Sequence, residues 1–366
     1  MIVAGFMSGT SMDGLDCCIA QIDIDSNLFL KYEIIANKSF EFDDKLRSKI
    51  KSFIGETDKD RLNEIDDLLG EKYLDLSKSF LSEYSFDAIA IHGQTVHHLD
   101  KKKSIQVGTP YYLSSFFKVP VIHQFRKKDI FYGGNGAPLM PFLDWLLFKK
   151  QKKNIITLNL GGIANISFIP KRANRDNIIG FDTGPGMSLI DESIDFFWQK
   201  RFDCNGIYSS KGKINDGMLN YLVDNSPFIF KAPPKSTGRE DFGLSFLNKT
   251  IEDFNHLNKN DIVRTLVKFS SLSIKINIER FINKKYSLDG LVVSGGGKKH
   301  PILMSDIKKD LDIPIFSALD YGVGSRFKES LLISVLGYAK MKNIKSNIPN
   351  VTGALKNVVL GEIYEN

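Results

Sequence analysis

The chain has 366 residues, of which 42% are hydrophobic and 25% charged, a globular composition that excludes a mostly disordered or fibrous protein. Its length predicts about two domains. The formal net charge of +6 is mild, and its short, scattered lysine runs favour a solvated surface over nucleic-acid binding, although the excess would also suit an anionic substrate. Three cysteines without a CxxC pattern, and a first segment without the basic region of a signal peptide, indicate a reduced, cytoplasmic setting. No apolar run reaches the roughly 20 residues that a membrane span needs.

The first part of the chain predicts a strand, a glycine-containing turn and a second strand, followed by helices and further strands. Apolar runs rich in small and β-branched residues predict strands at 2–6, 15–23, 29–35, 87–91 and 119–122. Apolar residues at steps of three and four predict helices at 44–54 and 61–84. A glycine- and proline-rich stretch at 127–141 predicts a loop, and we place a domain boundary near its start.

The second part repeats this opening of strand, glycine turn and strand. The predicted strands cover residues 154–160, 163–169, 178–181, 291–294 and 313–316. The predicted helices cover residues 189–200, 216–224, 239–255, 261–283 and 325–341. The repeat predicts an α/β fold of two similar domains, residues 1–126 and 127–349, with the tail 350–366 able to complete the first.

Glycine-rich turns follow strands at 9–14, 133–136, 161–162 and 295–297. Glycine lets backbone N–H groups approach and hold phosphate oxygens, although any single turn of this kind is equally an ordinary loop. Four of them beside hydroxyl and acidic residues favour phosphate binding. In the first turn, Thr10 and Ser11 could hold a terminal phosphate, and Asp13 could hold Mg²⁺ or simply cap the turn. Neither GxxxxGK[ST] nor GxGxxG is present, which argues against a P-loop or a dinucleotide-binding site.

Asp182 is the candidate general base. It follows an apolar strand in the sequence GFDTGPG, whose Gly/Pro-rich turn would fix a carboxylate at the end of a sheet. The alternative is an aspartate that only forms the turn. The segment 235–240 predicts a helix N-terminus with Ser236 or Thr237 as the cap, where an anion could also bind.

Histidines also end two predicted strands, at His92 and His123. The sequence has no HExxH motif and no cysteine partner for them, so a zinc site is not expected. It has no GxSxG motif either, which argues against a serine hydrolase.

Eight segments, in order, resemble the anhydro-N-acetylmuramic acid kinases, members of the sugar kinase/Hsp70/actin superfamily. They are GFMSGTSMDGLD at 5–16, HGQTVHH at 92–98, QVGTP at 106–110, FRKKDIFYGGNGAPLMP at 125–141, NLGGIANISF at 159–168, GFDTGPG at 180–186, PPKSTGREDF at 233–242 and SGGG at 294–297. The resemblance covers nearly the whole chain. It implies an α/β fold of two RNase H-like domains, of the actin, hexokinase and Hsp70 type, flanking a central cleft.

The resemblance also implies an activity. An ATP-dependent kinase of this family opens 1,6-anhydro-N-acetylmuramic acid with water at the anomeric carbon and phosphorylates the freed O6. The product is N-acetylmuramic acid 6-phosphate, an intermediate of cell-wall recycling. The cofactors would be ATP and Mg²⁺, the partners would be small-molecule substrates, and the assembly would be a cytoplasmic homodimer.

The same resemblance implies residue roles. Asp182 would activate the water. ATP and its phosphates would contact Gly9, Thr10, Ser11, Met12, Asp13, Gly14, Gly161, Gly162, Gly295, Gly296 and Gly297. The sugar would contact His92, Gln94, Arg126 and Glu329, with Arg126 as a two-pronged donor to the lactyl carboxylate or to a phosphate. Asp13 would hold Mg²⁺.

Three positions depart from the family's pattern. Gln124 stands where aspartate is usual, and Met187 and His300 stand where asparagine is usual. These changes leave Asp182 and the phosphate turns intact, so they bear on substrate, metal geometry and rate more than on nucleotide binding. Two alternatives therefore stay open: a divergent relative that phosphorylates another sugar, and a non-catalytic, actin-like nucleotide-binding module.

Overall fold

The computed structural model describes residues 1–9, 12, 14–317 and 327–365. The contacts within the chain divide it into two compact units: unit 1, of Met1–Leu147 and Phe327–Asn366, and unit 2, of Phe148–Arg326. The segments 127–147 and 327–349, predicted to lie in the second domain, belong to unit 1. The second of them does so because its helix, α11 (Lys328–Met341), packs against the central strands of unit 1. In the described ranges, no helix is long and apolar enough to cross a bilayer.

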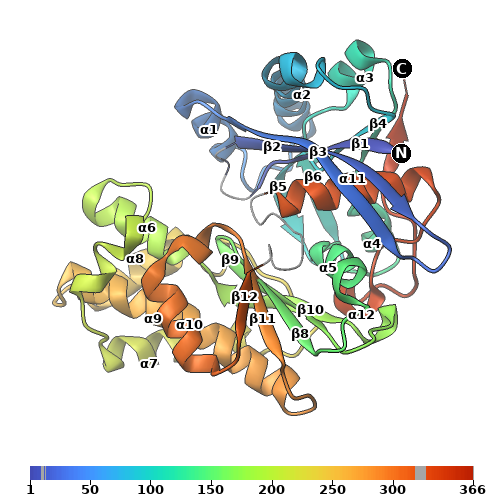
Figure 1. The fold of residues 1–366 in the computed structure, drawn as a ribbon. Helices are drawn as coiled ribbons and strands as arrows, with labels where there is room; N and C mark the ends of the chain where they lie inside the picture. Colours follow the sequence, from blue (N-terminus) through green and yellow to red (C-terminus); the bar gives the residue numbers. More distant parts are fainter. Residues whose placement is uncertain (10–11, 13, 318–326, 366) are drawn as a thin grey trace. The chain divides into compact units, whose positions relative to one another are not determined.

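Unit 1 is built on a mixed six-stranded sheet in the order β13-β7-β4-β1-β2-β3 (Figure 1). Its strands are β1 Ile2–Met7, β2 Gly14–Ile24, β3 Leu30–Glu41, β4 Ala88–Ile91, β7 Val121–His123 and β13 Glu362–Tyr364. A separate hairpin consists of β5 Gln94–Leu99 and β6 Lys103–Val107. The helices are α1 Asp44–Lys51, α2 Lys59–Leu81, α3 Tyr111–Phe117, α4 Lys127–Phe131, α5 Met140–Phe148, α11 and α12 Pro349–Thr352.

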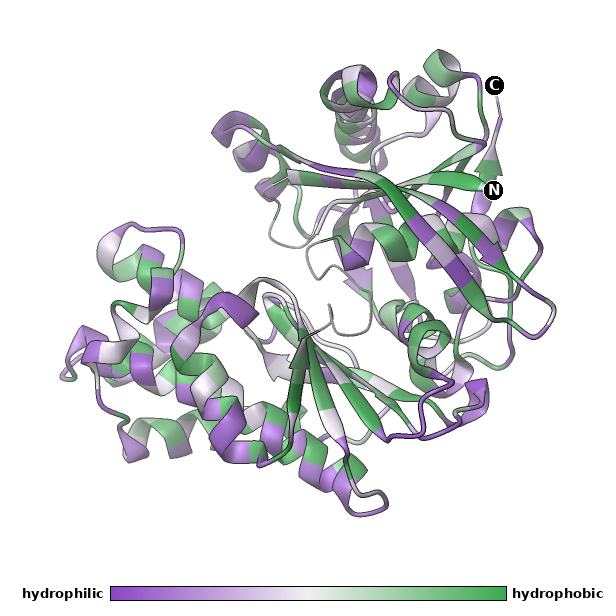
Figure 2. Ribbon diagram, in the orientation of Figure 1, coloured by the Kyte–Doolittle hydropathy of each residue, from purple (hydrophilic) through white to green (hydrophobic). Residues whose placement is uncertain are grey.

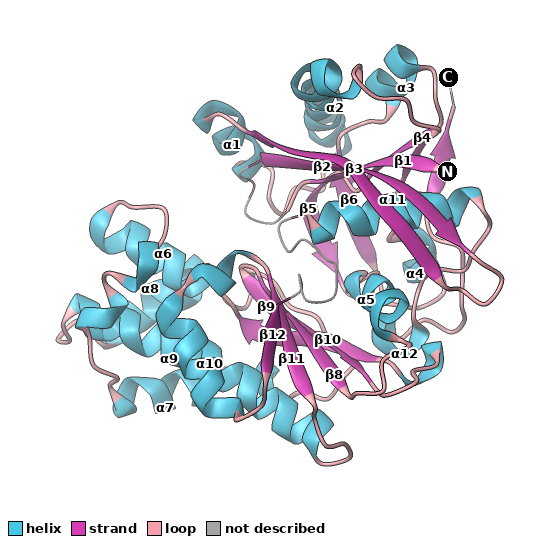
Figure 3. Cartoon of the chain, in the orientation of Figure 1, coloured by secondary structure: helices cyan, strands magenta, loops and turns pink. Residues whose placement is uncertain are grey.

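Helices cover both faces of the unit 1 sheet, as Figure 3 shows with α2 and α3 on one side and α11 on the other. The apolar side chains of α2, among them Leu69 and Tyr73, pack with Phe6 of β1. On the opposite face, α11 approaches β1 so closely that a Cβ on Gly5 would lie 2.4 Å from the backbone nitrogen of Ser334. Only glycine fits at this position.

Unit 2 contains a mixed five-stranded sheet in the order β10-β9-β8-β11-β12. Its strands are β8 Ile155–Leu160, β9 Ile163–Ile169, β10 Ile179–Pro185, β11 Gly290–Ser294 and β12 Ile315–Ser317. The helices are α6 Ser188–Trp198, α7 Asp216–Asp224, α8 Leu244–Asp253, α9 Lys259–Ile278 and α10 Pro301–Leu311.

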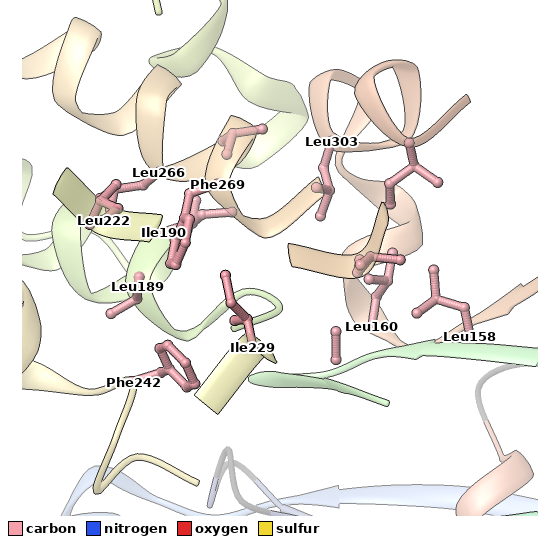
Figure 4. Close-up of a cluster of buried hydrophobic side chains, with 14 of the residues drawn as sticks. Leu158, Leu160, Leu189, Ile190, Leu222, Ile229, Phe242, Leu266, Phe269 and Leu303 are labelled. Atoms are coloured by element: carbon pink, nitrogen blue, oxygen red, sulfur yellow. The ribbon is translucent and has the colours of Figure 1, made fainter. Parts of the chain in front are cut away.

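The core of unit 2 lies between its sheet and its helices. Figure 2 shows the strands of this sheet as largely hydrophobic. Figure 4 shows part of the core, in which Leu158 and Leu160 of β8 share one buried cluster with Leu303 of α10 and Phe269 of α9. α9 thereby runs through the core, and it lies next to β10, where Asn277 of α9 donates to the Thr183 carbonyl oxygen.

Five strands of the unit 1 sheet share the topology of the unit 2 sheet, and β13, which pairs antiparallel with β7, has no counterpart there. β1, β2 and β3 form an antiparallel meander to which β4 and β7 add in parallel, and β8, β9, β10, β11 and β12 repeat this pattern. The repeat and the α/β class predicted from the sequence are confirmed. Parallel strands end at the same edge of a sheet, so β1, β4 and β7 end together in unit 1, and β8, β11 and β12 in unit 2. Ligands of open α/β sheets bind at such edges.

Some elements differ from the prediction. The predicted loop 127–141 contains the short helix α4, and α3, α5, α10 and the β5–β6 hairpin were not predicted. α5, MPFLDWLLF, is buried almost all round, so it lacks the polar face on which helical periodicity depends. The predicted helix at 239–255 begins only at Leu244 and is capped at Gly243, so the prediction that Ser236 or Thr237 caps it is wrong.

Candidate functional site

Ser8 and Gly9, at the end of β1, meet Gln94 at the start of the β5–β6 hairpin. The parallel pairing of Phe6 with Ile91 brings the residues after both strands together. Ser8 Oγ donates a hydrogen bond to Gln94 Oε1 at 2.6 Å, and Gln94 Nε2 donates to the carbonyl oxygen of Gly9 at 3.3 Å. Ser8 and Gln94 are both buried. The Gln94 side chain therefore ties the first glycine turn to the end of β4.

His92 and Arg126 are paired at the ends of β4 and β7. Arg126 Nε donates to His92 Nε2 at 3.0 Å, and His92 Nδ1 lies 2.8 Å from the carbonyl oxygen of Gly93. Because Nε2 accepts, the ring is neutral with its proton on Nδ1. Burial, and then the Arg126 charge, lower the pKa of His92 to about 3. Arg126 Nη1 also donates to the carbonyl oxygen of Gly136 at 2.9 Å, which fixes the plane of the guanidinium.

Asp129 organises the loop that carries Gly136. Its carboxylate is fully buried, and Oδ2 accepts a hydrogen bond from the Gly136 nitrogen at 2.8 Å. Oδ1 accepts from Asn347 Nδ2 and from Thr352 Oγ1, each at 2.8 Å. The loop beside Arg126 is thereby fastened to the C-terminal segment of unit 1.

The first glycine turn lies only partly within the described structure. Three of its predicted phosphate and metal ligands, Thr10, Ser11 and Asp13, lie outside the described residues. Met12 donates from its nitrogen to the Gly9 carbonyl oxygen at 3.1 Å, and its side chain belongs to the core of unit 1. Gly14 begins β2, where a Cβ would lie 2.4 Å from the carbonyl oxygen of Phe40. Met12 can therefore offer a ligand its backbone but not its buried side chain.

A cavity of about 200 Å³ lies beside His92 in unit 1, also lined by Gln106, His123, Gln124 and Tyr364. The Gln106 Oε1 atom is buried and has no hydrogen-bond partner among the described atoms. Burial lowers the pKa of His123, so its ring is held neutral. Gln124 adopts a left-handed backbone conformation at φ +58°. Asp66 lines the cavity as well, so the cavity offers a ligand neutral polar groups together with one carboxyl group.

Glu329 lies in the first turn of α11 and is half-buried. Its neighbour Lys328 forms a buried ion pair with Asp144 of α5, with Nζ 2.5 Å from Oδ1. Glu329 therefore sits on a helix end that is fastened within unit 1.

Asp182 lies in unit 2, in the middle of β10, and is 9% exposed. The prediction that it follows a strand, in a turn at the end of the sheet, is wrong, because the strand continues through Thr183 and Gly184 to Pro185. Its Oδ2 accepts a hydrogen bond from the Thr237 nitrogen at 2.9 Å, and its own nitrogen donates to the Lys235 carbonyl oxygen at 3.3 Å. The pairing of β10 with β9 shifts register between Asp182 and Gly184, which has φ +133°. A bulge of this kind turns a side chain out of the regular sheet pattern.

The segment around Lys235 is a support for Asp182 rather than a helix start. Thr237 uses its backbone N–H on Asp182, and its Oγ1 donates to Asp241 Oδ2 at 2.6 Å. Lys235 is 1% exposed, and its Nζ donates to Asn277 Oδ1 at 2.6 Å. Burial lowers the pKa of Lys235 to about 7, against the opposing effect of the Asp182 charge.

The glycine turns at 161–162 and 295–297 follow neighbouring parallel strands, β8 and β11. The carbonyl oxygens of Gly161 and Gly162 accept hydrogen bonds from the backbone nitrogens of residues 186–188, at 2.8 to 3.0 Å. Gly295 has φ +86°, and a Cβ on it would lie 2.6 Å from the Leu160 carbonyl oxygen. A Cβ on Gly296 would meet no atom within 4 Å. The turn at 295–297 thus packs on the turn at 161–162 and leaves open space above Gly296.

Two of the three departures from the family's pattern take up structural contacts in unit 2. Met187 packs against the core, and a Cβ on Gly297 would lie 3.0 Å from its Cγ. His300 caps α10 through Nδ1, which accepts from the Leu303 nitrogen at 3.1 Å, and its Nε2 lies 3.2 Å from Asp203 Oδ2.

The site residues named from the sequence thus fall into two groups. His92, Gln94 and Arg126 gather at one sheet edge in unit 1, and Asp182 and two glycine turns belong to unit 2. Sequence reasoning missed Asp129 and the side chain of Lys235, whose partners lie far along the chain. No group of three or more His, Cys, Asp or Glu side chains forms a metal cluster in the part of the chain that the structure describes.

Comparisons with known proteins agree over the full length. A family model described as anhydro-N-acetylmuramic acid kinase matches residues 1–366. A protein of that name from Clostridioides difficile (strain 630) is 35% identical over 377 aligned residues, which cover 99% of this chain and 98% of the relative. Proteins of the same name from Bacillus cereus (strain ZK / E33L) and Francisella tularensis subsp. novicida (strain U112) are 33% and 34% identical. These alignments cover 99% and 98% of this chain, and 99% and 97% of the relatives.

Proposed function

The chain belongs to the anhydro-N-acetylmuramic acid kinase family, and from this premise we propose which of its residues carry out the reaction. The enzyme is an ATP-dependent sugar kinase of cell-wall recycling. It opens the 1,6-anhydro bridge of 1,6-anhydro-N-acetylmuramic acid with water and phosphorylates O6, giving N-acetylmuramic acid 6-phosphate.

Asp182 is the general base of this proposal. As the water oxygen bonds to the anomeric carbon, the carboxylate takes the water's proton, and the bond between that carbon and O6 breaks. O6 then bonds to the γ-phosphorus of ATP, the bond between the γ-phosphorus and the β,γ-bridging oxygen breaks, and ADP leaves. A base in this role must be rigid and within reach of the water. The Thr237 N–H on Oδ2 and the bulge in β10 supply the rigidity and carry the assignment.

The glycine turns after β8 and β11 form the proposed ATP-binding site of unit 2. They lie at adjacent strand ends, and the open space at Gly296 lets a phosphate or ribose approach the backbone. In unit 1 the residues 9–14 would bind phosphate, chiefly through backbone groups. Phosphoryl transfer needs mainly positioning and charge neutralisation, which such turns provide.

Mg²⁺ is the proposed metal, with Asp13 as its protein ligand. Magnesium in kinases is held by one or two carboxylates together with substrate phosphates and water, so this enzyme does not need a preformed cluster of side chains. A bound Mg²⁺ would neutralise charge on the phosphates. The described residues would contribute by holding the turn that carries Asp13, through Met12 and Gln94.

The sugar acid is proposed to contact His92, Gln94, Arg126 and Glu329. The fixed guanidinium of Arg126 suits a carboxylate such as that of the lactyl group, because a planar donor pair matches two carboxylate oxygens. The cavity beside His92 is smaller than a pocket for a whole drug-sized ligand, so it would take one polar substituent. We also propose a cytoplasmic homodimer, which light scattering on the purified protein would test.

The deciding experiment is product analysis with ¹⁸O-labelled water. Wild-type enzyme with ATP and the anhydro sugar should give a 6-phosphate carrying one label at the anomeric oxygen. Asp182→Asn should lose nearly all turnover while binding ATP with unchanged affinity, whereas the exposed Asp195→Asn on α6 should behave as wild type. Full turnover in Asp182→Asn would rule out the base assignment.

A second candidate, a kinase for another sugar, is favoured only by Gln124. It lines the cavity beside His92, whereas Met187 and His300 have structural roles. A thermal-shift panel of amino sugars and anhydro sugars separates the two candidates. The first predicts the largest shift with 1,6-anhydro-N-acetylmuramic acid.

A further inference from the structure

Lys235 is a lysine buried in the interior of unit 2, behind the strand that carries Asp182. Its side chain is 1% exposed, and lysine is almost never buried to this extent unless its charge is paired or hydrogen-bonded. Nothing in the proposed chemistry uses this ammonium directly. Its burial therefore calls for another explanation.

The surroundings of Lys235 are matched to an ammonium ion. Its Nζ donates to three acceptors: the carbonyl oxygens of Phe228 and Ile229, at 3.1 and 3.3 Å, and Asn277 Oδ1 at 2.6 Å. Three acceptors satisfy the three N–H donors of the protonated lysine, which at a pKa of about 7 exchanges with the neutral amine near pH 7. The rings of Phe181, Phe228 and Phe281 also lie 4.7 to 5.5 Å from Nζ, a range in which aromatic faces attract cations.

Two lines of contact lead from Lys235 to Asp182. Along its own backbone, the Lys235 carbonyl oxygen accepts from the Asp182 nitrogen, and two residues later the Thr237 N–H holds Asp182 Oδ2. Through its side chain, Lys235 fixes Asn277, whose Nδ2 donates to the Thr183 carbonyl oxygen at 2.9 Å. The strand is therefore held on both sides of the carboxylate, at the point where its register shifts.

We propose that Lys235 is a positioning residue, which anchors the segment 235–237 and Asn277 on β10 and thereby holds the Asp182 carboxylate in place for the attacking water. This inference rests on the proposed role of Asp182 as the base. An apolar residue of similar length could fill the aromatic cage, but it could not hold Asn277 Oδ1 or the two carbonyl oxygens. Lysine is thus required for the orientation of the base, beyond the filling of the core.

The test is a double-mutant cycle with Lys235→Met and Asp182→Asn. Methionine keeps the length and the apolar stem of lysine and removes its three donors. We expect Lys235→Met to lower kcat by about 10- to 100-fold, the range that small misplacements of a reacting group produce, while KM for ATP stays within twofold. The exposed Lys231→Met, four residues before Lys235, is the matched control and should keep the wild-type kcat.

The Asp182→Asn background separates positioning from general structural damage. If Lys235 acts through the Asp182 carboxylate, adding Lys235→Met to Asp182→Asn should not lower the residual turnover any further. Long incubations with mass-spectrometric detection of the product would measure this turnover. An equal fold-loss in both backgrounds, a loss that appears only in KM for ATP, or no loss at all would each overturn the inference. Full activity of Asp182→Asn itself would instead refute the assignment of the base.

If Lys235→Met does not fold, a second variant tests whether Lys235 positions Asp182. Asn277→Asp keeps an acceptor for the ammonium but loses the Nδ2 donor to Thr183. We expect a fall in kcat, absent in the Asp182→Asn background, with an unchanged KM for ATP. An additive loss or unaltered kcat in this variant would refute the inference.

Discussion

Removing the Asp129 carboxylate should destabilise unit 1 strongly. In Asp129→Ala, three donors lose their acceptor: the Gly136 nitrogen, Asn347 Nδ2 and Thr352 Oγ1. The site is fully buried, so water replaces the lost acceptor poorly. An orphaned buried donor costs about 1 to 3 kcal/mol, which gives about 3 to 9 kcal/mol for the three together. This loss is comparable to the whole stability of a typical domain.

The two tryptophans allow this loss to be measured for each unit. Trp145 lies in α5 of unit 1 and Trp198 in α6 of unit 2. With Trp198→Phe as the background, urea unfolding followed by fluorescence reports on unit 1, and Trp145→Phe gives the report on unit 2. Asp129→Ala should move the unit 1 transition to markedly lower urea.

Two further variants grade the effect. Asp129→Asn keeps one acceptor oxygen and replaces the other by an amide N–H₂, which would face a donor. We therefore expect it to lower the free energy of unfolding by about half as much as Asp129→Ala. Asp75→Ala removes an exposed carboxylate that pairs with Lys72 and Lys78 of α2, and it should change stability by less than about 1 kcal/mol. A change below about 1 kcal/mol in Asp129→Ala, indistinguishable from Asp75→Ala, would refute the reasoning.

Further predictions concern pH and the glycine turn at 295–297. Since the pKa of His92 is lowered to about 3, the unfolded chain binds a proton near pH 6.5 that the native state does not, and stability should fall as the pH falls below 6.5. Between pH 6.5 and 5, His92 should lower the free energy of unfolding by about 2 kcal/mol. The urea midpoint should therefore fall less steeply with decreasing pH in His92→Gln than in the wild type. Parallel curves of urea midpoint against pH for the two proteins would contradict the assignment. Gly295→Ala should lower the melting temperature, because its Cβ would lie 2.6 Å from the Leu160 carbonyl oxygen at φ +86°. Gly296→Ala should leave the melting temperature unchanged and weaken ATP binding in calorimetry; an unaltered ATP affinity would argue against a nucleotide above that turn.

The repeat in the fold could be predicted because its signals are local. Strand β9 and helix α7 have the bounds predicted from apolar pattern and turn residues. Three of the four glycine turns follow strands, β1, β8 and β11, as predicted, since a glycine after an apolar run marks a strand end wherever the strand pairs. The turn at 133–136 follows helix α4 instead, so the prediction is wrong there. The repeat predicts that the two sheets share an arrangement, whereas the order in which the strands pair was not predicted.

The supports of the site could not be predicted, because they depend on contacts between distant residues. Lys235 reaches Asn277, which lies 42 positions away, and Asp129 reaches Asn347, 218 positions away. A lysine or aspartate in a polar, glycine-rich segment has the sequence signature of an exposed residue, and only the tertiary fold buries it. The same limit explains Thr237: its hydroxyl resembles a helix cap, while its backbone N–H holds Asp182.

The discontinuity of unit 1 bears on how the chain folds as it is made. Unit 2 is one continuous segment, so all its strands and helices can leave the ribosome and pack before synthesis ends. Unit 1 must wait for α11, which covers one face of its sheet, and for β13, which pairs with β7 at its edge. Until then the Asp129 carboxylate also lacks its partners from residues 347 and 352. A nascent chain that stalls before residue 327 would thus present a finished second unit joined to an open sheet, which makes the first unit the part that most needs protection from aggregation.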